Sequence, residues 1–380
     1  MKTTMMATIG LAAGAAFLLG LSMAGGESTA QNTSAEPVLV QPDGSYPTVP
    51  LEKDVVVLKV IQTGVNSLKS FPSIEEGLDF NLAHMEKMAN DACTRGKKPD
   101  ILLYHEFPLT GYSSGSRTEK LPYTVQIPGP ETDRLGKVAK ACDTYLIFGS
   151  YAVDPDWPGH ILSINTVINR EGEIVKKFWK SRNIKRLYAD REITTTTIEA
   201  VRDKYRAMYG MEEEFPVLQT EFGNIAVSTV QFDPFIFAAF AMRGTEIMLR
   251  TATLFDEADV TYTAFTNNYY SAMSNFALPL NPNYSAGESI IVDNKGKILA
   301  KEPTKDKDGI IEAEIPIAEF RKGRKIPNFA YEIVKPVFEQ YYQEIPINHL
   351  DLPREDLPET GAAMKDLFDR ISRYIGEGTE

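Results

Sequence analysis

The sequence predicts an α/β protein built as a four-layer α-β-β-α sandwich. Short apolar runs typical of strands alternate along the chain with segments whose apolar residues recur at helical spacing. Two pairs of strands are separated only by turn residues, which makes each pair an antiparallel hairpin. Alternating elements with hairpins among them require a mixed sheet or two sheets covered by helices, and a four-layer sandwich satisfies this requirement.

The first half of the chain supplies the most regular elements. Residues 55–62 form a nearly continuous β-branched run, as expected of a strand buried on both faces. A helix is predicted from Ser73 to Arg95, because Ser73 can cap it and Glu75 and Glu76 favour its first turn. The other elements predicted here are a strand at 101–104, a helix at 131–142, a strand at 145–151 and a hairpin of 164–168 with 174–178.

The alternation of strands and helices is interrupted at the start of the second half. Residues 181–213 are polar and highly charged, which indicates a helix-containing insertion over the sheet edge. The elements predicted after it are strands at 225–230 and 247–249, a helix between them at 235–243, and a hairpin of 289–293 with 298–300. The main domain is therefore expected at 54–324. The amphipathic residues 325–380 are expected to contact another subunit or the domain's own surface.

Composition narrows the range of partners. The 380 residues carry a net charge of −12, which disfavours nucleic acid and anionic membrane surfaces. Four histidines are scattered along the chain and no cysteine or histidine cluster has the spacing of a zinc site, so we expect neither a metal nor a cofactor. A small-molecule ligand is the expected partner.

The N-terminal residues 1–30 have the pattern of an export signal. Lys2 is followed by an apolar segment rich in Ala and Gly, and small residues precede Ala30, where we expect cleavage. The alternative is an uncleaved membrane anchor, but glycines make the segment weakly hydrophobic. We therefore expect a periplasmic or secreted protein without stable membrane insertion after cleavage. Residues 31–53 contain Pro37, Pro42, Pro47 and Pro50 and are predicted to be a flexible leader.

The chain contains two cysteines, Cys93 and Cys142. An oxidising compartment would allow them to form one disulfide. Their neighbours, however, are equally compatible with small apolar thiols in the core. The sequence leaves both possibilities open.

Two charged residues follow predicted strands. Glu106 comes directly after an apolar strand, at the sheet edge where α/β proteins bind ligands. Lys180 follows the strand that ends in Phe178-Trp179, and a lysine held near a buried carboxylate can stabilise a developing oxyanion. Each residue also has an ordinary interpretation, as a strand-end acid bonding loop amides and as a solvated surface lysine.

Longer motifs around these residues resemble the nitrilase, or carbon-nitrogen hydrolase, superfamily. His105 to Tyr112 is similar to its glutamate motif and Gly172 to Lys180 to its lysine motif, and the resemblance extends over about 54–324. It implies an α-β-β-α sandwich, a homodimer or larger homo-oligomer, and a Cys-Glu-Lys triad that attacks amides or nitriles. Glu106 matches the general base and Lys180 the electrostatic stabiliser.

The nucleophilic cysteine of that triad has no counterpart in Gly223 to Pro234. Counting forward from Gly223 places Val230 at its position, whereas counting backward from Pro234 points to Ser228. We favour Val230, because a deletion in the loop after the strand is less disruptive than one within it. A valine side chain has no lone pair, so it cannot act as the nucleophile of covalent acyl transfer.

Further residues are expected around the same cleft. The candidate ligand-binding residues are Tyr112, Gln231, Arg250 and Asn267, with a structural salt bridge as the ordinary interpretation of Arg250. A second, assisting glutamate implied by the resemblance falls within 199–214, where Glu199, Asp203 and Glu212 have equal claims.

Three functions fit these observations. The first is an altered amidase-like protein that keeps Glu106 and Lys180 and has lost thiol hydrolysis. The second is a working hydrolase that uses Ser228 or water as its nucleophile. The third is a structural or interaction protein. Retention of both charged partners argues against the third, because an unpaired buried charge is costly.

Overall fold

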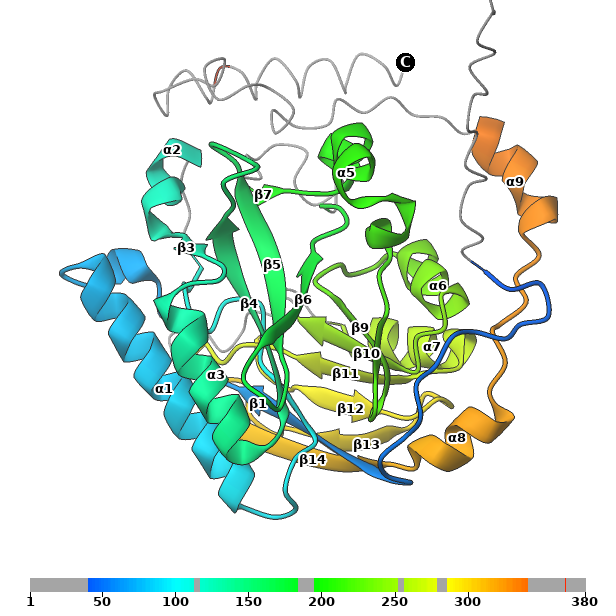
Figure 1. Ribbon diagram of the computed structural model, residues 1–380, viewed down its shortest axis with the longest axis horizontal. Coiled ribbons are helices and arrows are strands. Elements are labelled where there is room, and N and C mark those ends of the chain that lie inside the picture. Colours follow the sequence, from blue (N-terminus) through cyan, green and yellow to red (C-terminus); the bar gives the residue numbers. More distant parts are fainter. Residues whose placement is uncertain are drawn as a thin grey trace, which may run out of the picture. The chain divides into compact units, whose positions relative to one another are not determined.

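The computed structural model describes residues 40–112, 117–183, 195–251, 256–278, 286–340 and 366 (Figure 1). The expected export signal lies outside these ranges. No helix among the described residues is both long and apolar enough to cross a membrane.

The described strands form two sheets. The first is eight-stranded and runs β14 (Gly309–Ile315), β1 (Val56–Gln62), β2 (Ile101–Leu103), β4 (Tyr145–Val153), β5 (Ile161–Ile168), β6 (Ile174–Trp179), with β3 (Val125–Gln126) beside β4 and β7 (Thr195–Thr196) beside β5. The second is six-stranded and runs β13 (Ile298–Lys301), β12 (Ile290–Val292), β11 (Tyr270–Ser274), β10 (Ile247–Thr251), β9 (Gly223–Ser228), β8 (Leu218–Thr220). Strands β1, β2 and β4 are parallel, as are β9, β10 and β11.

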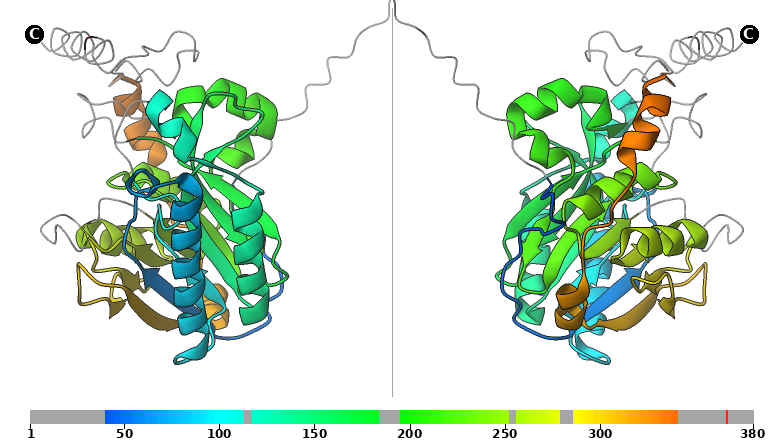
Figure 2. Two further views of the ribbon diagram at one scale, coloured as in Figure 1. Left: turned by 90° about the vertical axis from the view of Figure 1, so that its left-hand side faces the viewer. Right: turned by 90° about the vertical axis from the view of Figure 1, so that its right-hand side faces the viewer.

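Helices cover the outer face of each sheet. The helices that cover the sheets are α1 (Ile74–Thr94) and α3 (Pro130–Cys142) on the first sheet, and α6 (Pro234–Met242) and α7 (Glu257–Asn267) on the second. The left-hand view of Figure 2 shows α1 and α3 side by side. The other described helices are α2 (Arg117–Lys120), α5 (Arg202–Tyr209), α8 (Ile317–Gly323) and α9 (Tyr331–Gln340), with single 3₁₀ turns at Leu68–Ser70, Leu121–Tyr123, Glu199–Val201 and Met211–Glu214.

Strand β1 shows how the layers are held together. Val56, Leu58 and Val60 belong to the core between the two sheets, whereas Ile61 belongs to the core under α1 and α3. Side chains of a strand alternate between its faces, so a nearly continuous apolar run, broken at Lys59, fills both cores at once. The predicted four-layer α-β-β-α sandwich is therefore confirmed.

Most predicted elements agree with the structure to within a few residues. Ser73 accepts a hydrogen bond from the Glu76 amide and caps α1 as expected. Strand β9 ends at Ser228 rather than at 230. The elements that were not predicted include α7, β11 and β14, and also the short α2, α8, β3 and β8.

The leader differs from the flexible connector that its prolines suggest. Residues 40–53 contain no helix or strand, yet they are hydrogen-bonded to the domain. Tyr46 donates to Glu246, and the Pro47 carbonyl accepts from Asn224. The described part of the leader is therefore fixed along the second sheet.

Candidate active site

Glu106 is held at the carboxyl end of β2 by the neighbouring strand β4. The Tyr104 amide donates to the Ile147 carbonyl and the Gly149 amide donates to the His105 carbonyl, which extends the parallel ladder up to Glu106. A β-carbon on Gly149 would lie 2.4 Å from the Glu106 carbonyl oxygen. Only glycine allows the two backbones to approach this closely, so Gly149 fixes where the carboxylate emerges.

The Glu106 carboxylate lies in a small polar cluster. Its Oε1 accepts a hydrogen bond from Ser163 Oγ at 3.1 Å and lies 3.4 Å from Lys180 Nζ. The Glu106 side chain is 2% exposed and that of Lys180 is 18% exposed. Burial raises the pKa of Glu106, while the charge of Lys180 and the hydrogen bond from Ser163 act against that rise. The two predicted charged partners therefore lie together.

Ser163 was not predicted to belong to this site. It lies in β5, whose backbone accepts a hydrogen bond from the Lys180 amide, so one strand positions both the hydroxyl and the lysine. Polar Ser163 and Asn165 interrupt a strand that is otherwise largely apolar and is buried throughout. That interruption was the available signal, because buried polar side chains need partners.

His105 precedes Glu106 and is fully buried. Its Nε2 lies 2.8 Å from Thr63 Oγ, and its Nδ1 accepts from the Phe107 amide at 3.2 Å. A neutral ring protonated at Nε2 satisfies both contacts. Burial lowers the pKa of His105 to about 3.

This burial predicts a loss of stability in acid. Between pH 6.5 and about 3 the unfolded chain binds a proton at His105 that the folded chain does not, so stability falls as the pH falls. From pH 7.5 to pH 5, His105 alone should lower the free energy of unfolding by about 2 kcal/mol. His160, whose pKa burial lowers to about 4, acts in the same direction, and Glu106, with its raised pKa, acts in the opposite one.

Urea unfolding at the two pH values, for the wild type and for His105→Gln, checks this prediction. In the variant, the free energy of unfolding should differ between pH 7.5 and pH 5 by about 2 kcal/mol less than it does in the wild type. An unchanged difference would show that His105 does not titrate as its burial requires.

The segment after β9 carries the two candidate nucleophile positions. Strand β9 pairs with β10 in unbroken register, so the paired part of the strand contains no irregularity. Ser228 lies opposite Arg250. Val230 lies two residues beyond the strand and is 1% exposed, and Phe232 follows with a φ of 53°. The two candidate positions therefore lie at the carboxyl end of β9 and two residues beyond it.

Arg250 lies on the helical side of the second sheet. Its guanidinium donates to Gln231 Oε1 at 2.9 Å and to the Val230 carbonyl at 3.5 Å, and it forms an ion pair with Asp259 of α7. The ring of Phe237 in α6 lies 4.0 Å from it. Arg250 and Gln231 thus hold the turn in place, which matches the structural interpretation of Arg250 rather than anion binding.

The direction of Arg250 also places Ser228. Residues directly paired in parallel strands project from the same face of the sheet, so Ser228 projects toward the helices and away from Glu106 in the facing sheet. Its Oγ accepts from the Val230 amide, and no hydrogen bond joins it to Glu106 among the described residues. Thr251, the next residue of β10, instead donates to Asn165 of the first sheet at 2.9 Å.

The structure corrects the predicted position of Asn267. This residue ends α7, whose presence was missed, and it precedes β11. Tyr270 pairs with Ile247 at the start of β10. Since helix α7 returns the chain to the amino ends of the parallel strands, Asn267 lies at the edge opposite Val230. Tyr112, in contrast, follows the glutamate segment, and its ring lies 6.0 Å from that of Phe107.

The lysine segment and the turn after β9 are tied to each other. Arg182 Nη1 forms an ion pair with Asp233 Oδ2 at 2.7 Å, and Asp233 caps α6. Of the candidates for a second glutamate, Glu199 is joined to the segment that follows Lys180, since its backbone amide donates to the Ser181 carbonyl. Asp203 and Glu212 are exposed.

Both cysteines of the chain form one disulfide. Cys93 in the last turn of α1 is bonded to Cys142 at the end of α3, and no free cysteine remains. Both helices lead into the amino ends of parallel strands, whereas Glu106 follows the carboxyl end of β2. The disulfide therefore lies at the sheet edge opposite Glu106.

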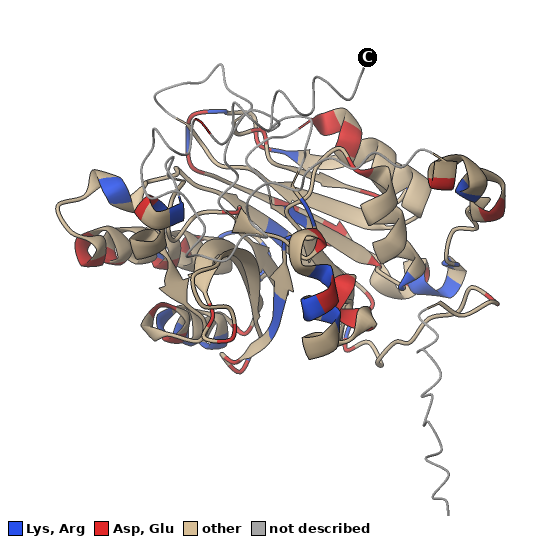
Figure 3. Cartoon of the chain, turned by 90° about the horizontal axis from the view of Figure 1, so that it is seen from above, with Lys and Arg blue, Asp and Glu red and all other residues tan. Residues whose placement is uncertain are grey.

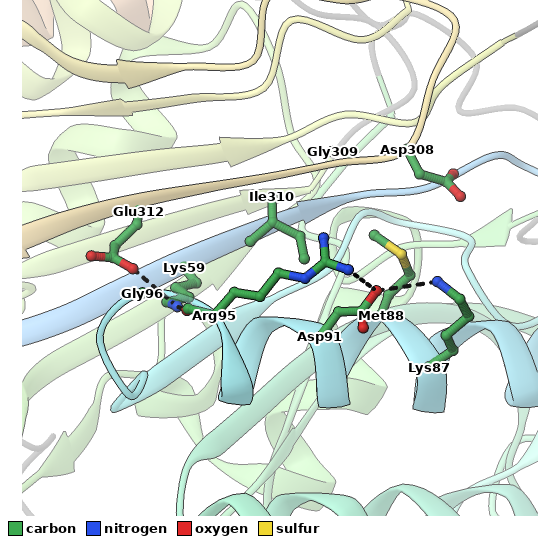
Figure 4. Close-up of a pocket in the computed structure, with 10 residues that line it drawn as sticks. All are labelled: Lys59, Lys87, Met88, Asp91, Arg95, Gly96, Asp308, Gly309, Ile310 and Glu312. Carbon is green, nitrogen blue, oxygen red and sulfur yellow. Dashed lines mark hydrogen bonds and ion pairs between the residues drawn. The ribbon is translucent and has the colours of Figure 1, made fainter.

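A pocket of about 450 Å³ lies on the helical side of the first sheet, between α1 and β14 (Figure 4). Its charged side chains are paired, Asp308 with His84 outside the lining and the others with one another. Lys59 forms an ion pair with Glu312 at 3.0 Å, and Asp91 forms ion pairs with Lys87 and Arg95. The lining does not include Glu106, Lys180 or Val230, so this pocket is separate from the candidate active site.

Comparison with known proteins agrees with this geometry. The carbon-nitrogen hydrolase family matches residues 72–325. Protein N-terminal amidase of Saccharomyces cerevisiae is 35% identical over 130 residues, which are 34% of this chain and only 27% of the yeast protein. The chain thus matches about a quarter of that relative's length.

Solved structures of an amidase from Nesterenkonia sp. AN1 share the fold. One aligns with a TM-score of 0.54 at 18% identity, covering 74% of this chain and 99% of the amidase. Another, a variant in which acrylamide has added to the active-site cysteine, aligns with a TM-score of 0.54 at 17% identity over the same shares.

The two-sheet sandwich with paired glutamate and lysine defines the class as amidase-like α/β proteins of the nitrilase superfamily. The family match covers well over half of the sequence. The chain belongs to the carbon-nitrogen hydrolase family.

Proposed function

We propose that this protein binds a small amide-like or carboxylate ligand at Glu106 and Lys180 and no longer hydrolyses amides through a thiol. The observation that carries the proposal is the contrast between two sites. The carboxylate and ammonium groups lie 3.4 Å apart, while both cysteines are bonded to each other elsewhere. A carboxylate and an ammonium can bind and polarise an amide, but acyl transfer also needs a nucleophile.

The ligand that this site favours is small and polar. An ionised Glu106 accepts hydrogen bonds from an amide nitrogen, and Lys180 donates to a carbonyl or carboxylate oxygen. Acidic and basic residues are interleaved over the described elements in Figure 3, and the net charge of −12 opposes polyanions. These features support a small-molecule ligand over nucleic acid.

Mass spectrometry and calorimetry on the same preparation test the proposal. The wild-type protein is incubated with acrylamide and with a panel of amides and nitriles. We expect no covalent mass increase and no hydrolysis, together with saturable binding of a panel member that Glu106→Gln removes. Glu171→Gln, at an exposed turn, is the matched control and should bind as the wild type does.

Each contrary result has a distinct meaning. An adduct on the wild-type protein would contradict the loss of thiol chemistry. Hydrolysis without an adduct would favour water or a hydroxyl as the nucleophile. Binding unaffected by Glu106→Gln would place the ligand elsewhere and leave the Glu106–Lys180 pair as a structural ion pair.

We also propose that the protein is exported and assembles into a homodimer or larger oligomer. The N-terminal pattern of residues 1–30 and the disulfide support an oxidising compartment. Helix α9 exposes Ile333 and Val337, 78% and 64% accessible, which supports burial against another chain. Light scattering of the mature protein measures the oligomeric state.

A further inference from the structure

A buried side-chain amide with one unpaired end lies near Glu106. Asn165 of β5 is fully buried. Its Oδ1 accepts a hydrogen bond from Thr251 Oγ1 at 2.9 Å, but its Nδ2 has no hydrogen-bond partner among the described residues. If the amide is turned round, the Thr251 hydroxyl bonds the nitrogen and the oxygen is left unpaired. In either orientation, one end of a buried amide can bind a further polar group, and leaving that end unpaired is costly.

The strand places Asn165 on the same face as Ser163. Alternate residues of a strand project from the same face, and from this face Ser163 donates to Glu106 Oε1. The hydrogen bond from Thr251 of β10 shows that the face is directed at the second sheet. Asn165 therefore projects into the space between the sheets, as the serine that contacts Glu106 does.

Gly149 brings the Glu106 backbone close to Asn165. Gly149 of β4 and Asn165 are direct partners in an antiparallel pair, so they project from the same face. A β-carbon on Gly149 would lie 2.6 Å from the Glu106 α-carbon. The β-carbons of direct partners lie about 5 Å apart, which puts the Asn165 β-carbon within about 8 Å of the Glu106 α-carbon. The unpaired amide end thus lies in the same region of the sandwich as Glu106.

We propose that Asn165 is a ligand-binding residue that bonds a hydroxyl group of the ligand whose amide lies at Glu106 and Lys180. This proposal rests on the ligand-binding function proposed above and narrows the ligand to small hydroxy amides. A hydroxyl group both donates and accepts hydrogen bonds, so it satisfies either end of the Asn165 amide. A ligand without a hydroxyl leaves that end unpaired, which weakens binding.

Calorimetry with matched amides tests the proposal. Propanamide, lactamide and 3-hydroxypropanamide share a three-carbon chain and an amide, and only the last two carry a hydroxyl, each on a different carbon. We expect the wild-type protein to bind one of the hydroxy amides at least about 5-fold more tightly than propanamide, as a buried hydrogen bond provides. Asn165→Leu, which removes the amide and keeps a similar volume, should abolish that preference.

Two further variants separate ligand binding from the structural role of Asn165. Thr166→Val is the matched control, because Thr166 is the next residue of β5, is equally buried, and has a hydroxyl that also lacks a partner among the described residues. It projects from the opposite face, so this variant should keep the preference. Thr251→Val removes the hydrogen bond between the sheets but leaves the Asn165 amide in place, and it should also keep the preference.

The possible results point to different conclusions. Equal binding of all three amides by the wild-type protein overturns the role of Asn165 alone, and this comparison depends on no variant. A preference that survives in Asn165→Leu, or that is lost equally in Thr251→Val, overturns it as well, and thermal unfolding of each variant identifies a folding defect. Failure of all three amides to bind contradicts the proposed function itself.

Discussion

Replacing Val230 with cysteine is expected to create a thiol that acrylamide modifies at least about 10-fold faster than an exposed cysteine. The reason is electrostatic, because a thiol near a lysine ammonium has a lowered pKa and a larger thiolate fraction at neutral pH. The Arg182–Asp233 ion pair ties the segment after Lys180 to the turn that contains Val230. The prediction rests on Val230 holding the nucleophile position that the family resemblance implies, which would bring the new thiol close to the Glu106–Lys180 pair, with Glu106 as its base.

The experiment is cleanest in a background without other thiols. Val230→Cys is combined with Cys93→Ala and Cys142→Ser, and adduct formation is followed by intact-mass spectrometry. Thr229→Cys is the matched control, one residue earlier in the chain. Adding Glu106→Gln to the Val230→Cys protein should slow the reaction. A rate no higher than that of an exposed cysteine, or a faster reaction at position 229, would reject Val230 as the position of the missing nucleophile.

Hydrolysis is the second measurement on the same variant. Restored turnover of a small amide would show that the rest of the triad is still competent. A reactive thiol without turnover would show that the turn after β9 does not place the nucleophile for attack on an amide.

Removing the disulfide is expected to lower the free energy of unfolding by about 4 kcal/mol. Cys93 and Cys142 are separated by 49 residues, and a cross-link over a loop of this length restricts the unfolded chain by roughly that amount. For a chain of this size the loss corresponds to a decrease in Tm of roughly 5 °C. Urea unfolding of Cys93→Ala/Cys142→Ser, compared with the wild type, measures it.

The reductant supplies the control for this prediction. Dithiothreitol should destabilise the wild-type protein by the same amount and leave the double variant unchanged. A wild-type protein that is insensitive to reductant, or that reacts with a thiol reagent before unfolding, would mean that the disulfide does not form. Ligand binding at Glu106 should survive in the double variant, since the disulfide lies at the opposite sheet edge.

Several parts of the fold could be predicted because they depend on local patterns. The run at 55–62 and the capped helix after Ser73 carry their signals in adjacent residues. Strand β14 was missed because the glutamates in Gly309–Ile315 interrupt the apolar pattern, and its pairing with β1 joins residues more than 240 positions apart. Missing α7 had a larger effect, because it moved Asn267 to the wrong sheet edge.

The residues of the candidate site could also be predicted only in part from the sequence. Glu106 and Lys180 could be named from their motifs, and the absence of a cysteine after Gly223 is visible in the sequence alone. Ser163 was not predicted, although a polar residue in an otherwise largely apolar strand was the available signal. Its role arises only when β5 is brought beside Glu106.

The sequence by itself determined the layer order, the two charged residues and the lack of a cysteine near the turn, because each follows from side-chain type and spacing. Only the tertiary structure decided that the two cysteines bond to each other, that Arg250 holds the turn from the helical side, and that Ser163 donates to Glu106. Those three facts depend on distances between residues far apart in the chain. Such distances are fixed by packing and not by local preference.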